Sequence, residues 1–232
     1  CGNKISPDAF DEEIRKNSRR YTEQFGDQLV KEGYRGYFEL DFLIDKNDGE
    51  VYLGECNPRV TGASSMTNHA AFAHADAPLF LFHLLEFSNV PFKIDVKELN
   101  NRWADSDNID DWCQMVIKHT DDSVDILTEA PESGIWNLLP DGSVEFNRFD
   151  YHRRAVSSDT EAFFLRISNV GDYRYEGADL GILVTRGRAM NKAFQLNKRS
   201  KQWIEGIKSK FKAKPLPTAE ALPISDPAFK IM

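Results

Sequence analysis

The sequence contains little cysteine and no long apolar run. Its 232 residues include three cysteines, Cys1, Cys56 and Cys113, and this wide spacing supports neither a disulfide framework nor a zinc site. No stretch approaches the roughly 18 apolar residues that a membrane span requires. We therefore expect a protein of the reducing cytoplasm, in which Cys56 is a packed thiol.

Positive charge is also scarce. The chain has 29 Lys and Arg residues against 37 Asp and Glu residues, which gives a net charge of −8 and argues against a nucleic-acid-binding surface. The basic residues at 198–201 and 208–214 are expected to form a solvated helix face. A hydrophobic content of 41% is enough for a real core, and the length allows one large domain or two small ones.

The most informative segment is residues 36–59. Residues 37–45 and 50–56 have the composition of strands, and the Lys-Asn-Asp-Gly sequence at 46–49 is typical of a turn between them. Side chains alternate across a strand. One face of the first strand should therefore carry Glu39, Asp41 and Leu43, and one face of the second should carry Leu53, Glu55 and Asn57.

Antiparallel pairing of these strands would bring Asp41, Glu55 and Asn57 together, with Arg59 just beyond. Neighbouring carboxylates repel unless a cation or a proton intervenes, and Mg²⁺ shared with substrate phosphates prefers such oxygen ligands. The alternative is an ordinary amphipathic hairpin with its acids in solvent. The metal site is favoured because the opposite face of the first strand is apolar, with Phe38, Leu40, Phe42 and Ile44.

This segment resembles the metal-binding hairpin of the ATP-grasp fold, which has an acidic residue in one strand and Glu-x-Asn-x-Arg in the next. The resemblance implies that Asp41 and Glu55 hold one or two Mg²⁺ (or Mn²⁺) ions, with Asn57 as a further ligand. Arg59 would act in catalysis, facing the transferred phosphoryl group of ATP or an acyl-phosphate intermediate. Glu39 is a further cofactor-binding candidate.

The segment that follows the motif, residues 60–68, is small and polar. In ATP-grasp ligases the corresponding loop contacts the carboxylate or acyl-phosphate end of the substrate, which makes Gly62, Ser64 and Ser65 candidates for binding. An ordinary loop leading into a helix explains the composition equally well. The histidines that follow, His69, His74 and His83, are assigned no role.

Only 35 residues precede the first strand of the hairpin, and most of them predict one helix. Ser6 and Pro7 are expected to start it, and Gly33 to end it. Its apolar stripe consists of Phe10, Ile14, Tyr21, Phe25 and Leu29. The half of an ATP-grasp protein that clamps the nucleotide is thus missing. Because the chain also begins with Cys rather than Met, we expect the C-terminal half of a longer enzyme, inactive alone.

The rest of the chain predicts an α+β fold, with a β-rich region after the hairpin. We expect a buried helix at 78–87, a polar surface excursion at 100–112 and a closing helix at 196–211. Short strands are expected at 114–119, 123–128, 134–138, 143–149, 162–167 and 181–185. The predicted regions are 1–90 with the metal hairpin, 91–212 with the strands and closing helix, and a proline-rich tail at 213–232.

Strands followed by one helix also resemble the C-terminal lid of biotin-carboxylase-like proteins. Those carboxylases have Gln-Val-Glu-His after the motif arginine, whereas this chain has no acid at 60–64. We therefore predict a ligase that joins a small carboxylate to an amine. A biotin-carboxylase-like enzyme, a non-catalytic nucleotide-binding relic and a protein-interaction module are the alternatives. The expected partners are these substrates and the missing half, without nucleic acid or membrane, and a homodimer is left open.

Overall fold

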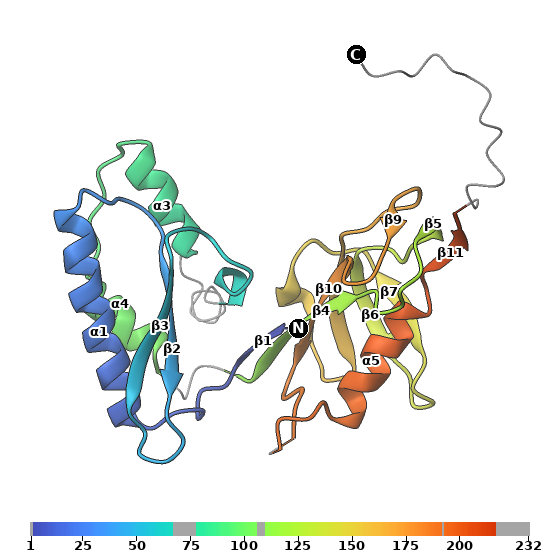
Figure 1. The fold of residues 1–232 in the computed structure, drawn as a ribbon, viewed down its shortest axis with the longest axis horizontal. Helices are drawn as coiled ribbons and strands as arrows, with labels where there is room; N and C mark the ends of the chain where they lie inside the picture. The colour runs from blue at the N-terminus through green and yellow to red at the C-terminus, as the bar shows by residue number, and fades with distance from the viewer. Residues whose placement is uncertain (1, 67–77, 106–109, 192, 217–232) are drawn as a thin grey trace. The chain divides into compact units, whose positions relative to one another are not determined.

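The computed structural model describes residues 2–66, 78–105, 110–191 and 193–216, which fall into two compact units (Figure 1). The hairpin unit comprises residues 3–113, and the sheet unit comprises residues 1–2 and 114–232. The division passes through the strands β1 (Gly2–Ile5) and β4 (Trp112–Lys118). None of the described helices is long and apolar enough to cross a membrane.

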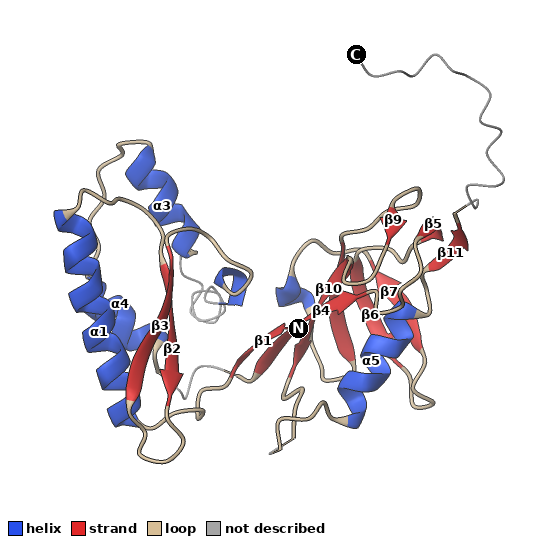
Figure 2. Ribbon diagram, in the orientation of Figure 1, coloured by secondary structure: helices blue, strands red, loops and turns tan. Residues whose placement is uncertain are grey.

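In the hairpin unit, helices accompany a two-stranded antiparallel sheet, and residues 64–66 after the hairpin are also helical (Figure 2). The elements are α1 (Glu12–Lys31), β2 (Glu39–Ile44), β3 (Val51–Asn57), α3 (Leu79–Phe87) and α4 (Val96–Trp103). The turn at 46–49 joins β2 to β3 as predicted, and Gly49 has a φ of 77°, which favours glycine.

The helix α1 begins later than predicted. Its N-cap is Asp11, whose carboxylate accepts a hydrogen bond from the Ile14 amide at 2.9 Å, so Ser6 and Pro7 do not start the helix. Two cap signals lie within six residues, and the second is the one that satisfies a free amide of the first turn. Phe10 therefore lies before the helix and is 53% exposed, rather than forming part of the stripe.

The helix α3 is present where it was predicted, but it is not buried. None of its residues is buried, and Leu84 and Phe87 are 60% and 56% exposed. Its sequence is apolar nearly all round, and within the described ranges its Phe80 ring lies against Tyr37 and its Phe82 ring against Phe92. The apolar composition led to the prediction of a buried helix. Composition alone does not show how many sides of a helix the rest of the chain covers.

Residues 91–113, predicted to open the second region, belong to the hairpin unit. The Arg15 side chain of α1 donates to the Ala104 carbonyl at 2.6 Å, and the Ser6 hydroxyl donates to Asp111 at 3.0 Å. The predicted surface excursion at 100–112 contains the end of α4, and part of it, 106–109, lies outside the described residues.

The sheet unit is built on a six-stranded sheet with the order β1-β4-β10-β8-β6-β7. Its further strands are β6 (Gly134–Leu138), β7 (Val144–Arg148), β8 (Glu161–Arg166) and β10 (Asp179–Arg186). The pairs β10–β8, β8–β6 and β6–β7 are antiparallel. A second sheet has the order β11-β5-β9 and consists of β5 (Asp125–Glu129), β9 (Tyr173–Arg174) and β11 (Lys212–Pro215).

The helix α5 (Lys198–Lys208) closes the core of the sheet unit. Trp203 and Ile207 are fully buried, and a Cβ on Gly206 would lie 2.5 Å from Val144 of β7, so the helix packs closely against that strand. The predicted tail begins as a strand, because β11 pairs with β5; residues 217–232 lie outside the described part of the chain. The mixed fold with antiparallel sheets confirms the predicted α+β class.

Candidate active site

The register of the hairpin places its polar residues directly opposite each other. Asp41 is paired with Glu55, and Glu39 is paired with Asn57. Directly opposed residues of an antiparallel pair lie on the same face, with Cβ atoms roughly 5 Å apart. Asp41, Glu55 and Asn57 therefore share a face, which is the arrangement that the alternation of the sequence predicts.

The same face does not include Leu53, contrary to the prediction. The pairing shifts between Asp41 and Phe42, so Gly54 is an extra residue in β3 and Leu53 lies opposite Phe42. This β-bulge turns Leu53 to the face of Phe42. A Cβ on Gly54 would lie 3.2 Å from the carbonyl oxygen of Asp41, a close approach that glycine permits.

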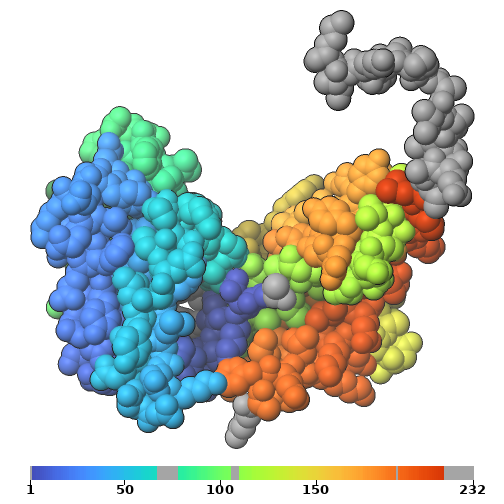
Figure 3. Space-filling model, in the orientation of Figure 1, coloured from blue at the N-terminus to red at the C-terminus, as the bar shows by residue number. Residues whose placement is uncertain are grey.

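The two faces of the hairpin have different neighbours. On the apolar face, Phe38 lies against α1, with its ring centroid 6.4 Å from that of Phe25. On the other face Asp41 and Glu55 are exposed, whereas Asn57 is buried. Figure 3 shows the blue surface of α1 beside the lighter blue hairpin. The carboxylates thus stand on the face that α1 leaves open.

The donor atoms suit a hard divalent cation. Two carboxylates opposite each other destabilise a sheet unless a positive charge lies between them, and Asn57 adds a neutral oxygen donor. Mg²⁺ is usually held by one or two carboxylates together with waters and substrate phosphates. Within the described ranges no three His, Cys, Asp or Glu side chains are grouped so as to hold a metal ion. The chain itself thus offers a partial ligand set.

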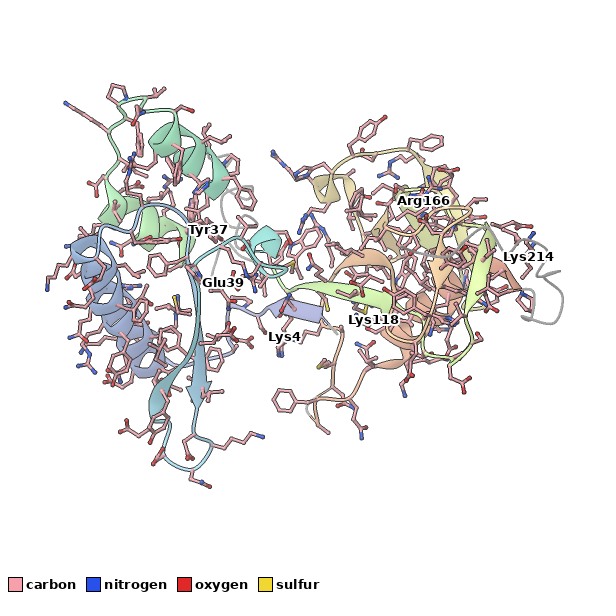
Figure 4. All side chains as sticks on the ribbon, turned by 45° about the horizontal axis from the view of Figure 1, so that its top comes forward. Lys4, Tyr37, Glu39, Lys118, Arg166 and Lys214 are labelled. Atoms are coloured by element: carbon pink, nitrogen blue, oxygen red, sulfur yellow. The ribbon has the colours of Figure 1, made fainter. Side chains whose placement is uncertain are left out.

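Glu39 is already engaged by the loop that follows the motif. Its Oε1 accepts a hydrogen bond from the Thr61 hydroxyl at 2.6 Å, and its Oε2 accepts one from the Ser64 hydroxyl at 3.1 Å. Figure 4 shows Glu39 near the start of β2. This carboxylate therefore anchors the loop to the hairpin, which is a different role from the predicted contact with a cofactor.

The loop residues that were predicted to bind substrate differ in accessibility. Ser64 is fully buried and also accepts from the Thr61 amide at 2.8 Å, so its position does not suit contact with a substrate. Gly62 is exposed, and Ser65 is half-buried. The sequence interpretation missed Thr61; the signal for it was a pair of hydroxyl residues three positions apart, which is typical of a side-chain-stabilised turn.

Arg59 follows the hairpin and is exposed. Its backbone amide donates to the Asn57 carbonyl at 2.8 Å, and its guanidinium donates to the Val60 carbonyl at 3.3 Å. The turn at 57–59 therefore fixes the backbone position from which the Arg59 side chain extends. Of the three histidines, His69 and His74 lie outside the described residues, and His83 lies on α3.

No family model matches the chain, and no curated protein matches it in sequence. Among solved structures, it is similar to N5-carboxyaminoimidazole ribonucleotide synthetase from Thermotoga maritima, with a TM-score of 0.50 and 12% sequence identity. That synthetase is an ATP-grasp carboxylate-amine ligase. This chain has part of an ATP-grasp fold.

The likeness covers 91% of this chain and 45% of the synthetase, so the chain spans less than half the length of its structural neighbour. At this identity the likeness establishes the fold. It confirms, for the fold, the resemblance that the Glu-x-Asn-x-Arg motif at 55–59 predicts.

Proposed function

We propose that this chain is the C-terminal part of an ATP-grasp ligase that uses Mg²⁺ and ATP to join a carboxylate to an amine. The carboxylate would attack the γ-phosphate of ATP to give an acyl phosphate and ADP. The amine would then displace phosphate to form the new bond. The acid and the amine are small molecules, and the preceding region of the protein would hold the nucleotide.

The observation that carries this proposal is the direct opposition of Asp41 and Glu55 in a hairpin whose fold is similar to that of an ATP-grasp ligase. Ordinary hairpins avoid like charges at opposed positions because they destabilise the pairing. Here the pair is accompanied by Asn57 on the same face and by Arg59 two residues later. This combination supports a site for a cation and phosphates better than a solvated sheet surface.

The residues would act mainly through charge. Asp41 and Glu55, with Asn57, would hold Mg²⁺, which neutralises the phosphate oxygens during transfer of the phosphoryl group. Arg59 would contact the transferred group, for which its planar guanidinium offers two parallel donors. Glu39 would act indirectly, by holding the loop at 61–64 through its hydrogen bonds with Thr61 and Ser64.

The test is Glu55→Gln in the protein that includes the preceding region. The substitution keeps the shape of the side chain and removes one negative charge from the proposed metal site. We expect Mg-ATP-dependent phosphate release, assayed with mixtures of small carboxylates and amines, to fall about a hundredfold or more. Circular dichroism should remain that of the wild type.

Glu50→Gln is the matched control, since Glu50 is an exposed acid of the same hairpin outside the Asp41–Glu55 face. It should leave phosphate release unchanged. Wild-type turnover in Glu55→Gln would contradict the ligase proposal. A wild-type protein that binds Mg-ATP but releases no phosphate with any mixture would instead favour a non-catalytic nucleotide-binding protein.

A further inference from the structure

The segment that leads into β2 is held against α3 by a series of contacts. Arg35 donates through Nε to the Glu86 carboxylate at 2.7 Å and through Nη2 to the Glu86 carbonyl at 2.9 Å. Both side chains are about half exposed, at 53% and 42%, so this ion pair alone contributes little. It nevertheless ties residue 35 to the last turn of α3.

The next residue makes the approach possible. Gly36 has a φ of 120°, and a Cβ at this position would lie 3.1 Å from the Phe87 ring and 3.2 Å from Cε1 of His83. Both the backbone conformation and the space therefore require glycine. The chain comes as close to α3 here as a backbone without a side chain allows.

The backbone amide and the backbone carbonyl of Tyr37 are both hydrogen-bonded. Its amide donates to Nδ1 of His83 at 3.2 Å, and its carbonyl accepts from the Tyr34 hydroxyl. Its ring also stacks on Phe80 of α3, with centroids 5.8 Å apart. Figure 4 shows Tyr37 and Glu39 next to each other at the start of β2.

The direction of the bond identifies the atom that holds Tyr37. A ring nitrogen that accepts an amide proton carries no proton itself, so Nδ1 of His83 is the acceptor. A side chain without an acceptor at this position would leave the Tyr37 amide without this hydrogen bond.

We propose that His83 is a positioning residue for the carboxylate hairpin. Through Nδ1 it holds the Tyr37 peptide, two residues before Glu39 and four before Asp41. Without this acceptor the bond is lost, and the segment that leads into β2 is held less firmly against α3. The consequence for catalysis rests on the proposed function, whereas the structural coupling does not.

Other groups around His83 do not replace this bond. The charged side chains on the packed segments are Arg35 and Glu86, which pair with each other, and the remaining titratable groups are the phenols of Tyr34 and Tyr37. A hollow of about 320 Å³ beside the imidazole is lined mainly by apolar residues, among them Phe82 and Phe92. Among the described groups, the acceptor for the Tyr37 amide is therefore His83.

The test uses the 232-residue chain without nucleotide or metal. Hydrogen exchange of the Tyr37 amide is followed by NMR at neutral pH. We expect exchange to be about tenfold faster in His83→Leu, which offers no acceptor, and to be restored in His83→Asn, because the amide oxygen of Asn can accept from the Tyr37 amide.

His152→Leu is the matched control. His152 lies in the sheet unit, and its Nδ1 also accepts a hydrogen bond from a backbone amide, that of Arg154, at 3.0 Å. This variant should leave exchange of the Tyr37 amide unchanged. A Tyr37 amide that exchanges no faster in His83→Leu than in the wild type, or as fast in His83→Asn as in His83→Leu, would overturn the proposal. Where His83→Leu fails to fold, His83→Ala takes its place in the same comparison.

A second arm connects the bond to turnover in the protein with its preceding region. Phosphate release should fall on the order of tenfold in His83→Leu and be restored in His83→Asn. If Glu55→Gln turns over like the wild type while the Tyr37 amide still exchanges faster in His83→Leu, the proposed function fails and the positioning role of His83 stands. Wild-type turnover in His83→Leu would refute its effect on the reaction.

Discussion

At the scale of single residues, the carboxylates of this protein differ in what neutralises them. Asp41 and Glu55 are exposed and oppose each other, whereas Glu161 of β8 lies in the sheet unit within a set of donors. Arg148 donates to Glu161 at 2.8 Å, and Ser157 donates through its amide and its hydroxyl at 2.8 and 2.7 Å. Because these donors satisfy its carboxylate, Glu161 links β8 to β7 and needs no ligand from outside the chain.

These donors lower the pKa of Glu161 from 4.5 to about 2, with Arg148 as the main cause. A carboxyl with a lowered pKa stabilises the folded protein above its ordinary pKa, and the contribution is lost as pH falls toward the folded value. Glu161→Gln should therefore lower the free energy of unfolding at neutral pH by about 2 kcal/mol, as expected for hydrogen bonds to a charged group. Urea unfolding measures this difference.

The difference between Glu161→Gln and the wild type should shrink as pH falls from 4.5 and vanish near about pH 2. Glu145→Gln serves as the control, because Glu145 is an exposed carboxylate on β7 of the same sheet, and it should change stability little at any pH. A loss in Glu161→Gln that stays constant down to acid pH would show that the charge of Glu161 is not its cause.

At the scale of elements, the bulge in β3 sets which side chains join the carboxylate face. Gly54 is the extra residue, and its Cα approaches the Asp41 carbonyl so closely that an added Cβ would lie 3.2 Å away. Bulges turn side chains and are common next to active sites. Here the bulge keeps Glu55 opposite Asp41 while Leu53 is turned to the face of Phe42.

Gly54→Val should open the bulge, because a branched side chain meets both the Asp41 backbone and Leu43. We expect a loss of about 1 to 3 kcal/mol in the stability of the hairpin unit, as for overpacking elsewhere, with shifted amide resonances of Asp41 and Glu55. Gly62→Ala, whose added Cβ meets nothing within 4 Å, is the steric control. Unchanged hairpin resonances in Gly54→Val would mean that the bulge is not sterically fixed.

The elements also indicate what the sequence could predict. Strand β6 has the predicted bounds, because Gly134 and the turn at 139–142 mark both ends of an apolar run. The face shared by Asp41, Glu55 and Asn57 follows from strict alternation. The bulge at Gly54 and the hydrogen bond from the Tyr37 amide to His83 could not be predicted from the sequence. Each depends on a contact between residues that no local sequence pattern links. Strands β1 and β9 are too short to show alternation.

At the scale of the whole molecule, the two units differ in how much apolar surface they bury. Of the buried apolar residues in the described chain, all but four lie in the sheet unit. The four are Val51, Met66, Trp112 and Cys113, and the last two belong to β4 at the division. The hairpin unit, which holds the candidate active site, instead exposes residues such as Leu43 and Leu84, at 65% and 60%.

Buried apolar area is the main source of stability, so the two units should open with different free energies. In native-state hydrogen exchange of the chain, we expect the slowest amides in β6, β8 and β10 of the sheet unit. Amides of β2 and β3 should exchange faster by a factor on the order of 100 or more, because local opening there exposes little additional apolar surface. Mass spectrometry of proteolytic fragments after deuterium labelling can measure both sets in one experiment.

The same measurement tests whether the open face of the hairpin belongs inside a larger site. With the proposed preceding region present, exchange in β2 and β3 should slow, since additional chain would cover the carboxylate face, while exchange in β6 and β8 should not change. Adding Mg-ATP should slow the hairpin amides further in the wild type and less in Glu55→Gln, because a ligand stabilises the state that it binds. Equal protection of the hairpin with and without the preceding region would place the nucleotide site elsewhere in the protein.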